Sequence, residues 1–293
     1  MTKYERIATL AEETAKQITK NSMEWTSYLH TASRLYRYPF DEQILIYAQR
    51  PDATACALIE QWNKKLNCWV NRGAKGIALI DRTSTRPKLK YVFDISDVHK
   101  ARRIGRFPKL WKLKEEHKEY VITCLEKSYG ETNSKLPFEH RLVELAERIV
   151  LDSYEELLKD LSYVSQRSFL EDLDEQNVGV RLRETLVASI AYTLLVRCGA
   201  TMEQWKEELN FDYISDFNTS KTLSILGSAT TEISKCLLME IGRSIVAYER
   251  NVVQHKTRAT PEKKLEKGLA NASEIDYNAL NRENKKKKED LGE

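Results

Sequence analysis

The sequence predicts an α+β fold, in which a small N-terminal α+β unit with a β-hairpin precedes a mainly helical domain. Only six prolines and ten glycines interrupt 293 residues, which favours long helices. Apolar residues recur at helical spacing after residue 115. We therefore expect an α+β unit at 1–98, a basic connecting segment at 99–114, a helical domain at 115–256 and a polar, disordered tail at 257–293.

Three helices are expected before residue 50. Residues 4–20 place their apolar side chains on one helical face. Asn21 offers a cap for a second helix, which Pro39 ends, because proline lacks the N–H group that a helix needs. A third, short helix is predicted at 41–49.

The next stretch changes to a pattern typical of strands. Residues 57–66 form one more predicted helix. Residues 68–71 and 77–81 are apolar runs on either side of a turn at 72–76, so we predict a β-hairpin. Residues 91–94 are a predicted third strand.

The C-terminal half contains three strongly apolar helical patterns. They cover residues 141–161, 181–197 and 230–248. Gly199 follows the second pattern in the C-cap position. Residues 99–114 lack periodicity, and we expect an irregular surface segment there.

The bulk composition excludes several classes of protein. An apolar share of 41% with 31% charged residues is typical of a soluble globular chain. Neither a run of eighteen apolar residues nor a signal-peptide core occurs, so we expect a cytoplasmic protein without a membrane partner. Five cysteines without a CxxC pair favour reduced thiols over disulfides or zinc.

Charge is unevenly distributed along the chain. Residues 82–114 contain eleven Lys or Arg against two Asp, a net charge of +9, interleaved with aromatic residues. Cations follow a phosphate backbone and aromatic rings stack on bases, although a solvated loop with its aromatic rings in the core gives the same pattern. The candidate nucleic-acid-binding residues of this run are Arg82, Lys100, Arg102, Arg103, Arg106, Lys109, Trp111 and Lys112.

The turn at 72–76 is a second candidate for binding phosphate. Gly73 and Gly76 permit positive φ values, so successive N–H groups can point into one concavity, and Arg72 and Lys75 add charge around it. A hairpin turn without a ligand has the same composition. The turn is too short for a nucleotide-binding P-loop.

Catalytic and metal-binding patterns are absent from the sequence. The five histidines are dispersed, and neither HExxH nor GxSxG occurs. We therefore expect a protein that is not an enzyme and that needs no cofactor or metal. A hydrolase whose site assembles only in three dimensions is the alternative.

A family resemblance emerges over residues 36–81. An aromatic-rich helix, a tryptophan helix and V-x-[KR]-G-x-K-G, here Val70 to Gly76, occur in order before a strand. This block resembles the N-terminal domain of ArdC-type antirestriction proteins. It resembles more closely the N-terminal region of large polyvalent proteins of conjugative elements in Gram-positive bacteria, and that likeness extends over residues 20–250.

The resemblance implies single-stranded-DNA binding and protection of conjugating DNA. Its motif matches Gln43, Tyr47, Gln49, Trp62, Arg72, Gly73, Lys75 and Gly76. The candidate base contacts are Gln43, Tyr47, Gln49, Trp62 and Trp69, although a tryptophan at helical spacing, such as Trp62, is also typical of a core. The family's asparagine in the short helix is replaced near Asp41 or Gln43. The protease-like half with HExxH, and the helicase and methylase modules, are missing.

Two functions remain open at this point. The first is a single-stranded-DNA-binding protein of a mobile genetic element. The second is a protein-binding inhibitor of host defence, such as an anti-CRISPR on an RNA-guided nuclease, in which the acidic residues at 152–175 mimic nucleic acid. Binding to other proteins of the mobile element is also possible. The placement of the cations distinguishes these functions. DNA binding is favoured if one face of the protein contains Arg72, Lys75, the cations of 82–114 and an exposed aromatic ring. Inhibition of a host-defence nuclease is favoured if the cations are scattered.

Overall fold

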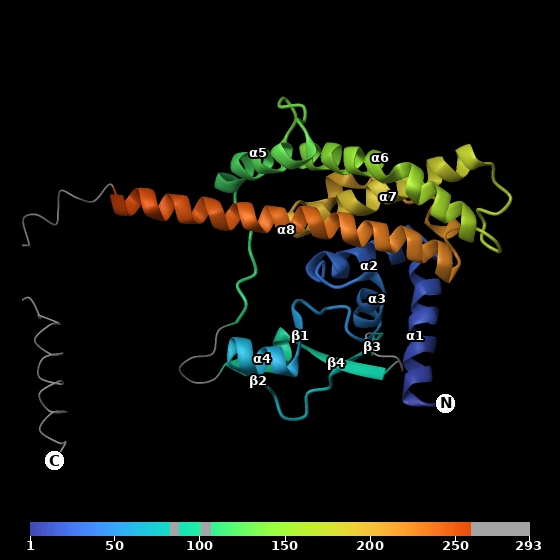
Figure 1. Ribbon diagram of the computed structural model, residues 1–293, viewed down its shortest axis with the longest axis horizontal. Helices are drawn as coiled ribbons and strands as arrows, with labels where there is room; N and C mark the ends of the chain where they lie inside the picture. Colours follow the sequence, from blue (N-terminus) through green and yellow to red (C-terminus); the bar gives the residue numbers. More distant parts are fainter. Residues whose placement is uncertain (83–87, 101–106, 259–293) are drawn as a thin grey trace, which may run out of the picture. The chain divides into compact units, whose positions relative to one another are not determined.

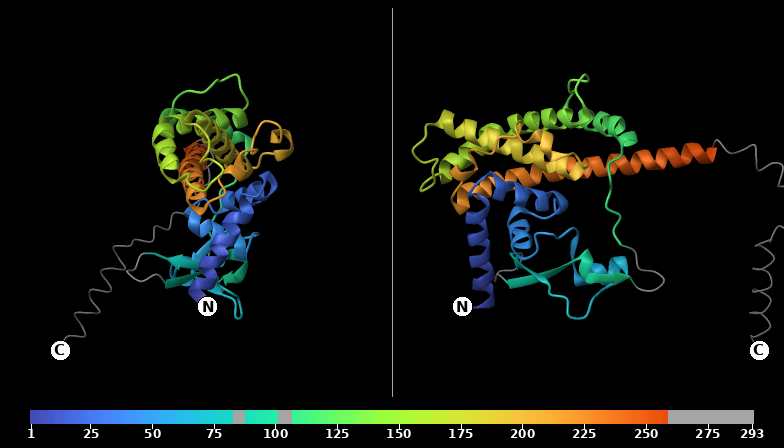
Figure 2. Two further views of the ribbon diagram at one scale, coloured as in Figure 1. Left: turned by 90° about the vertical axis from the view of Figure 1, so that its right-hand side faces the viewer. Right: turned by 180° about the vertical axis from the view of Figure 1, so that it is seen from behind.

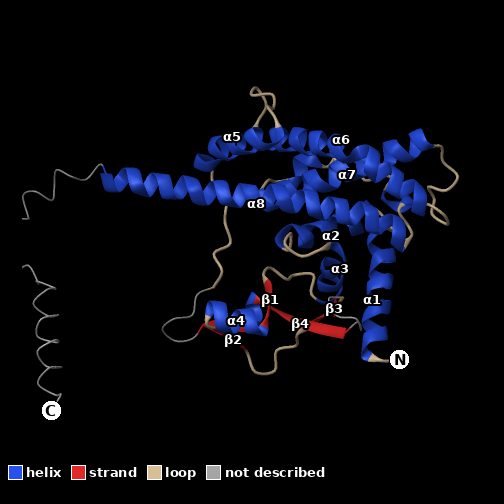
Figure 3. Cartoon of the chain, in the orientation of Figure 1, coloured by secondary structure: helices blue, strands red, loops and turns tan. Residues whose placement is uncertain are grey.

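The computed structural model describes residues 1–82, 88–100 and 107–258. Small antiparallel sheets lie in the N-terminal part, and helices make up most of the rest (Figures 1 and 3). The predicted α+β class is therefore confirmed. Residues 1–246 form one compact unit, and the described residues 247–258 lie outside it. The predicted disordered tail, apart from its first two residues, lies outside the described residues.

Three helices open the chain, as predicted, but the second ends at Arg34 and Pro39 is the N-cap of the third, so the prediction that Pro39 ends the second helix is wrong. These helices are α1 (Lys3–Ile18), α2 (Ser22–Arg34) and α3 (Phe40–Gln49). The Asn21 side chain accepts a hydrogen bond from the Glu24 N–H, so it caps α2. Helix α1 packs against α3, and α2 packs against a helix of the C-terminal half.

Five short strands and one helix follow. They are β1 (Cys56–Leu58), α4 (Ile59–Leu66), β2 (Cys68–Val70), β3 (Ile77–Asp81), β4 (Lys88–Asp94) and β5 (Val98–Lys100). One sheet has the order β1-β4-β3 and the other consists of β2 and β5, with all pairs antiparallel.

The predicted hairpin between 68–71 and 77–81 is wrong. Strand β3 pairs with β4, and β2 pairs with β5, so residues 71–76 join two different sheets. The reason is that the two runs belong to different cores. Cys68 of β2 packs with Trp62, whereas Leu79 of β3 packs with residues of α3.

The C-terminal half is helical, as predicted. Its helices are α5 (Lys118–Tyr129), α6 (Phe138–Val164), α7 (Glu175–Cys198) and α8 (Ser220–Arg258). Gly199 ends α7 with φ of 86°, and its N–H donates to the Leu195 and Val196 carbonyls, which confirms the predicted cap. In the described part of the chain, no helix is long and apolar enough to cross a membrane.

The largest core joins the N-terminal helices to the C-terminal ones. Trp25 of α2 is fully buried, and its Nε1 donates to Ser189 Oγ of α7 at 2.8 Å. Residues 107–114 have no regular structure and lead from the vicinity of α4 to α5 (Figures 1 and 2). This agrees with the predicted irregular segment, although β5 at 98–100 was not expected.

Candidate nucleic-acid interface

A cavity of about 490 Å³ lies where the connecting segment passes the end of α7. Its walls come from the C-terminal end of α2 with residues 35–38, from residues 54–57, from α4, from residues 108–112 and from the last turn of α7. Segments more than 150 residues apart in the sequence therefore meet around one space.

The described lining of this cavity is basic. Five of its side chains are cationic and none is a carboxylate; the cations are Arg34, Arg37, Lys109, Lys112 and Arg197. Four aromatic residues also line it: Tyr36, Tyr38, Trp62 and Trp111. The surface is therefore suited to an anionic ligand with flat apolar parts.

Arg197, at the end of α7, is partly buried beneath the connecting segment. Its guanidinium lies 3.5 Å from the centroid of the Trp111 ring, a cation–π contact, and its Nη2 donates to the Trp111 carbonyl at 2.9 Å. Trp111 Nε1 in turn donates to the Tyr36 hydroxyl at 3.2 Å. These contacts fix the connecting segment against the end of α7.

A second guanidinium lies near the same tyrosine. Arg37 and Arg197 lie 5.8 and 6.0 Å from the centroid of the Tyr36 ring. Burial lowers the pKa of Arg197, and the positive charge of Arg37 lowers it further. The cavity thus holds two like charges that interact unfavourably.

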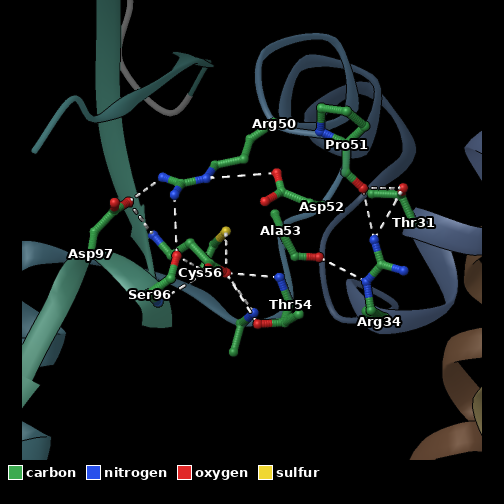
Figure 4. A network of polar contacts seen from close by, with 12 residues as sticks. Thr31, Arg34, Arg50, Pro51, Asp52, Ala53, Thr54, Cys56, Ser96 and Asp97 are labelled. Carbon is green, nitrogen blue, oxygen red and sulfur yellow. Dashed lines mark hydrogen bonds and ion pairs between the residues drawn. The ribbon is translucent and has the colours of Figure 1, made fainter.

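Arg34 supports another wall of the cavity. Its Nε donates to the Ala53 carbonyl at 2.9 Å and its Nη2 to the Pro51 carbonyl at 2.7 Å (Figure 4). Arg50 binds the other side of this loop, with Nη1 donating to Asp97 Oδ2 at 2.6 Å. Arg34 therefore positions the wall and adds positive charge to it.

Asp94 anchors the same wall from inside the protein. Only 2% of Asp94 is exposed, and its Oδ1 accepts hydrogen bonds from the Thr54 and Ala55 N–H groups at 2.7 and 2.9 Å. Burial opposes the charged form, but the hydrogen bonds from Ser96, Ala55 and Thr54 outweigh it and hold the pKa of Asp94 below its usual value. Asp94 is therefore ionised behind the wall.

The predicted cations do not all meet in one place, and this scatter favours the inhibitor over the DNA-binding protein. Lys109 and Lys112, together with Trp111, line the cavity. Arg72 and Lys75 are exposed but are not part of its lining. The remaining predicted cations fall into two groups. Arg82 pairs with Asp41 at 3.7 Å and Lys100 lies over Phe107, whereas Arg102, Arg103 and Arg106 lie outside the described residues.

The turn at 72–76 has one of its two expected glycine conformations. Gly73 has φ of 86°, as predicted. Gly76 does not have a positive φ, so that part of the prediction is wrong. A Cβ at Gly76 would lie 3.1 Å from atoms of Tyr91 and Phe93, so close packing against β4 explains this glycine instead.

Burial contradicts two predicted base contacts, and the polar bonds of a third indicate a structural role. Gln43 is 2% exposed, accepts from the Tyr28 hydroxyl and donates to the Leu35 and Tyr38 carbonyls. Trp62 is fully buried, and its Nε1 donates to the Phe93 carbonyl. Gln49 binds both the N–H and the carbonyl of Ala78 in β3.

The other two predicted base contacts differ in exposure. Tyr47 is half-buried and packs edge-on against Tyr28, with ring centroids 5.8 Å apart. Trp69 is 52% exposed, and it lies opposite His99 in the β2–β5 pair. Trp69 therefore keeps a ring face accessible, but it is not part of the cavity lining.

Sequence reasoning missed two of the residues that make the cavity basic. Arg37 and Arg197 lie far from the basic run at 82–114. A weak signal existed for Arg197, which is a cation at the end of the most apolar helix, two residues before the predicted Gly199 cap. Nothing in the sequence indicated that Trp111 would cover it.

Neither metal-binding side chains nor known relatives assign a function to this cavity. Over the described ranges, no cluster of three His, Cys, Asp or Glu side chains is placed to hold a metal. Comparison of the chain with protein-family models, with curated proteins and with solved structures finds no match.

Proposed function

We propose that this protein binds single-stranded DNA through the basic cavity at the end of α7. The observation that carries the proposal is that five cations and the rings of Tyr36, Tyr38 and Trp111 converge on one cavity whose described lining contains no carboxylate. Handling or protecting conjugating DNA for a mobile element is the biological role that the family resemblance adds. We further propose that the protein is not an enzyme.

Physical chemistry favours a single strand as the ligand. A single strand exposes both its phosphates and the faces of its unpaired bases, so cations and aromatic rings can act together. Lys109 and Lys112 are exposed at the edge of the cavity, where they can follow the backbone, and Arg197 lies further in. A duplex presents the phosphates but keeps its bases stacked.

A salt titration tests the proposal. Fluorescence anisotropy of a labelled strand of about 20 nucleotides is measured over a series of salt concentrations. Affinity should fall steeply with salt. In the double variant Lys109→Gln, Lys112→Gln, the slope of log K against log salt should decrease by about 1.4, because two phosphate contacts at about 0.7 each are lost.

The matched control changes Lys64 and Lys65 to glutamine. Both are exposed on α4 but do not line the cavity, so the slope should stay close to that of the wild type. The variant Arg72→Ala, Lys75→Ala tests the turn in the same assay. Absence of binding at low salt, or equal affinity for a duplex, would overturn the proposal. Cleavage of the strand in Mg²⁺ or Mn²⁺ would overturn the non-enzymatic part.

One surface favours the second candidate function, inhibition of a host-defence nuclease. All eight carboxylates of residues 152–175 are exposed. Three of them, Glu155, Glu171 and Glu175, line a groove of about 930 Å³ between α6 and α7. Tyr163, which also lines the groove, is 90% exposed, and Phe169 is 64% exposed. Exposed aromatic rings among carboxylates are suited to a basic protein surface.

A pull-down separates the two candidate functions. The immobilised protein is offered a purified RNA-guided nuclease without target DNA. Retention of the nuclease by the wild type, and its loss in Tyr163→Ser, Phe169→Ser, would support inhibition. Retention of single-stranded DNA alone would leave the first proposal in place and reject the second.

A further inference from the structure

Two guanidinium groups in the cavity have no carboxylate to neutralise them. Among the residues that the structure describes, neither Arg37 nor Arg197 forms a salt bridge, and both lie about 6 Å from the centroid of the Tyr36 ring. Elsewhere in the molecule, the partly buried Arg50 and Arg181 each contact an aspartate within 2.8 Å. Arg197 therefore lacks the carboxylate partner that these two partly buried arginines have.

Arg197 is held in place before any ligand arrives. Trp111 covers its guanidinium at 3.5 Å, and the Trp111 carbonyl accepts from Nη2 at 2.9 Å. Arg37 is exposed and lines the same cavity, so its guanidinium can reach a ligand from the solvent. The positive charge of Arg37 disfavours the charged form of Arg197, and an anion with more than one negative charge that contacts both guanidinium groups relieves this repulsion.

The size of the cavity limits what can enter it. A volume of about 490 Å³ is in the range of pockets that hold one small molecule. One nucleotide fits this description, whereas a run of several nucleotides does not. A strand would therefore place one terminal residue in the cavity and leave the rest outside, along Lys109 and Lys112.

We propose that Arg37 and Arg197 form a subsite for the phosphate monoester at the end of a DNA strand. This inference rests on the proposed DNA binding. A terminal phosphate has a charge of about −1.5 to −2 and three acceptor oxygens, whereas each internal phosphodiester has one negative charge. The planar guanidinium forks of two arginines match that dianion in charge and in geometry.

The test uses the full-length protein and strands labelled at an internal base, so that both ends are free. Three strands of one sequence have a 5′-phosphate, a 3′-phosphate or hydroxyl groups only. One phosphorylated strand should bind about tenfold more tightly than the hydroxyl strand, as one charge-assisted contact allows. Thymidine monophosphate, added as a competitor, should displace it only weakly.

Two variants examine the residues separately. Arg197→Gln and Arg37→Gln should each remove most of the preference for the phosphorylated end, and Arg37 is exposed, so its variant leaves the Trp111 contact intact. The matched control is Arg183→Gln, an exposed arginine on the same helix, which should keep the preference.

The outcomes distinguish the two proposals. Equal binding of all three strands overturns the subsite but leaves DNA binding in place. A preference that survives in both variants also overturns it, as does displacement by the mononucleotide at the concentration at which the phosphorylated strand itself competes. If no strand binds, both proposals fail together.

Discussion

Gly242 of α8 leaves the space that the indole of Trp111 occupies. A Cβ at position 242 would lie 2.7 Å from Trp111 Nε1 and 2.8 Å from Cδ1, closer than real Cβ contacts come. A helix residue 131 positions away in the sequence thus determines where the connecting segment lies. Through Trp111 it also determines the position of Arg197.

Gly242→Ala should therefore weaken DNA binding without unfolding the protein. The new methyl group displaces Trp111 and loosens Arg197, and we expect an affinity several-fold lower, equivalent to about 1 kcal/mol. Alanine improves helix propensity by about 0.5–1 kcal/mol, which offsets part of the clash in the free energy of unfolding. Fluorescence anisotropy measures the DNA affinity, and urea denaturation measures the free energy of unfolding. Val246→Ala, an exposed site one turn later, is the control, and equal effects of the two changes would contradict the prediction.

Asp94→Asn should destabilise the protein at neutral pH by about 2 kcal/mol. In the wild type, the Ser96 N–H donates to Asp94 Oδ2. Asparagine keeps one acceptor oxygen but places an NH₂ group against donors such as this N–H, so a hydrogen bond is lost. Because the folded pKa of Asp94 is depressed, its contribution to stability is present above the unfolded pKa, about 3.9, and is lost as pH falls through the folded pKa.

The pH dependence is the check on this assignment. The difference in unfolding free energy between wild type and Asp94→Asn should be largest at pH 7 and should shrink below about pH 4. Urea denaturation at several pH values measures it. Asp172→Asn, at an exposed carboxylate, should behave like the wild type. A difference that does not change with pH would show that ionisation of Asp94 is not involved.

Truncation of the two tryptophans near the α4–β2 corner should lower the free energy of unfolding by very different amounts. Trp62 is fully buried and hydrogen-bonded, so Trp62→Ala should cost about 3–5 kcal/mol of stability. Trp69 is half exposed, and Trp69→Ala should cost less than about 1 kcal/mol. Urea denaturation compares the variants. Similar losses would mean that Trp69 is buried in solution and cannot stack on a base.

Cysteine reactivity should separate the exposed thiol of Cys236 from the partly buried thiols of Cys56 and Cys198. Burial raises the pKa of Cys56 and of Cys198 to about 12, so at pH 7.5 few thiolates form at either position. Cys236 is exposed. Maleimide labelling followed by mass spectrometry should modify Cys236 first, and Cys56 and Cys198 only after unfolding. Early modification of Cys56 would show that the cavity wall opens in the native protein.

The sequence by itself determined where most helices lie and two of their caps, although some predicted ends were wrong; the pattern at 230–248, for example, is only the middle of α8. Helix formation depends on neighbouring residues, so periodicity and capping chemistry predict it, as at Asn21 before α2 and Gly199 after α7. Charge patterning likewise identified residues 109–112, which line the cavity. These features depend on separations of a few residues, which the sequence displays directly.

The partners of the strands and the residues of the cavity were decided only by the tertiary structure. Strand β2 pairs with β5 and not with the nearby β3, because each strand buries its apolar side chains in a different core. Tyr36, Trp111 and Arg197 likewise meet from three separate segments. Their cation–π and hydrogen-bond contacts form only when α2 and α7 are packed together. That packing depends on many weak contacts between residues far apart in the sequence, which no local pattern encodes.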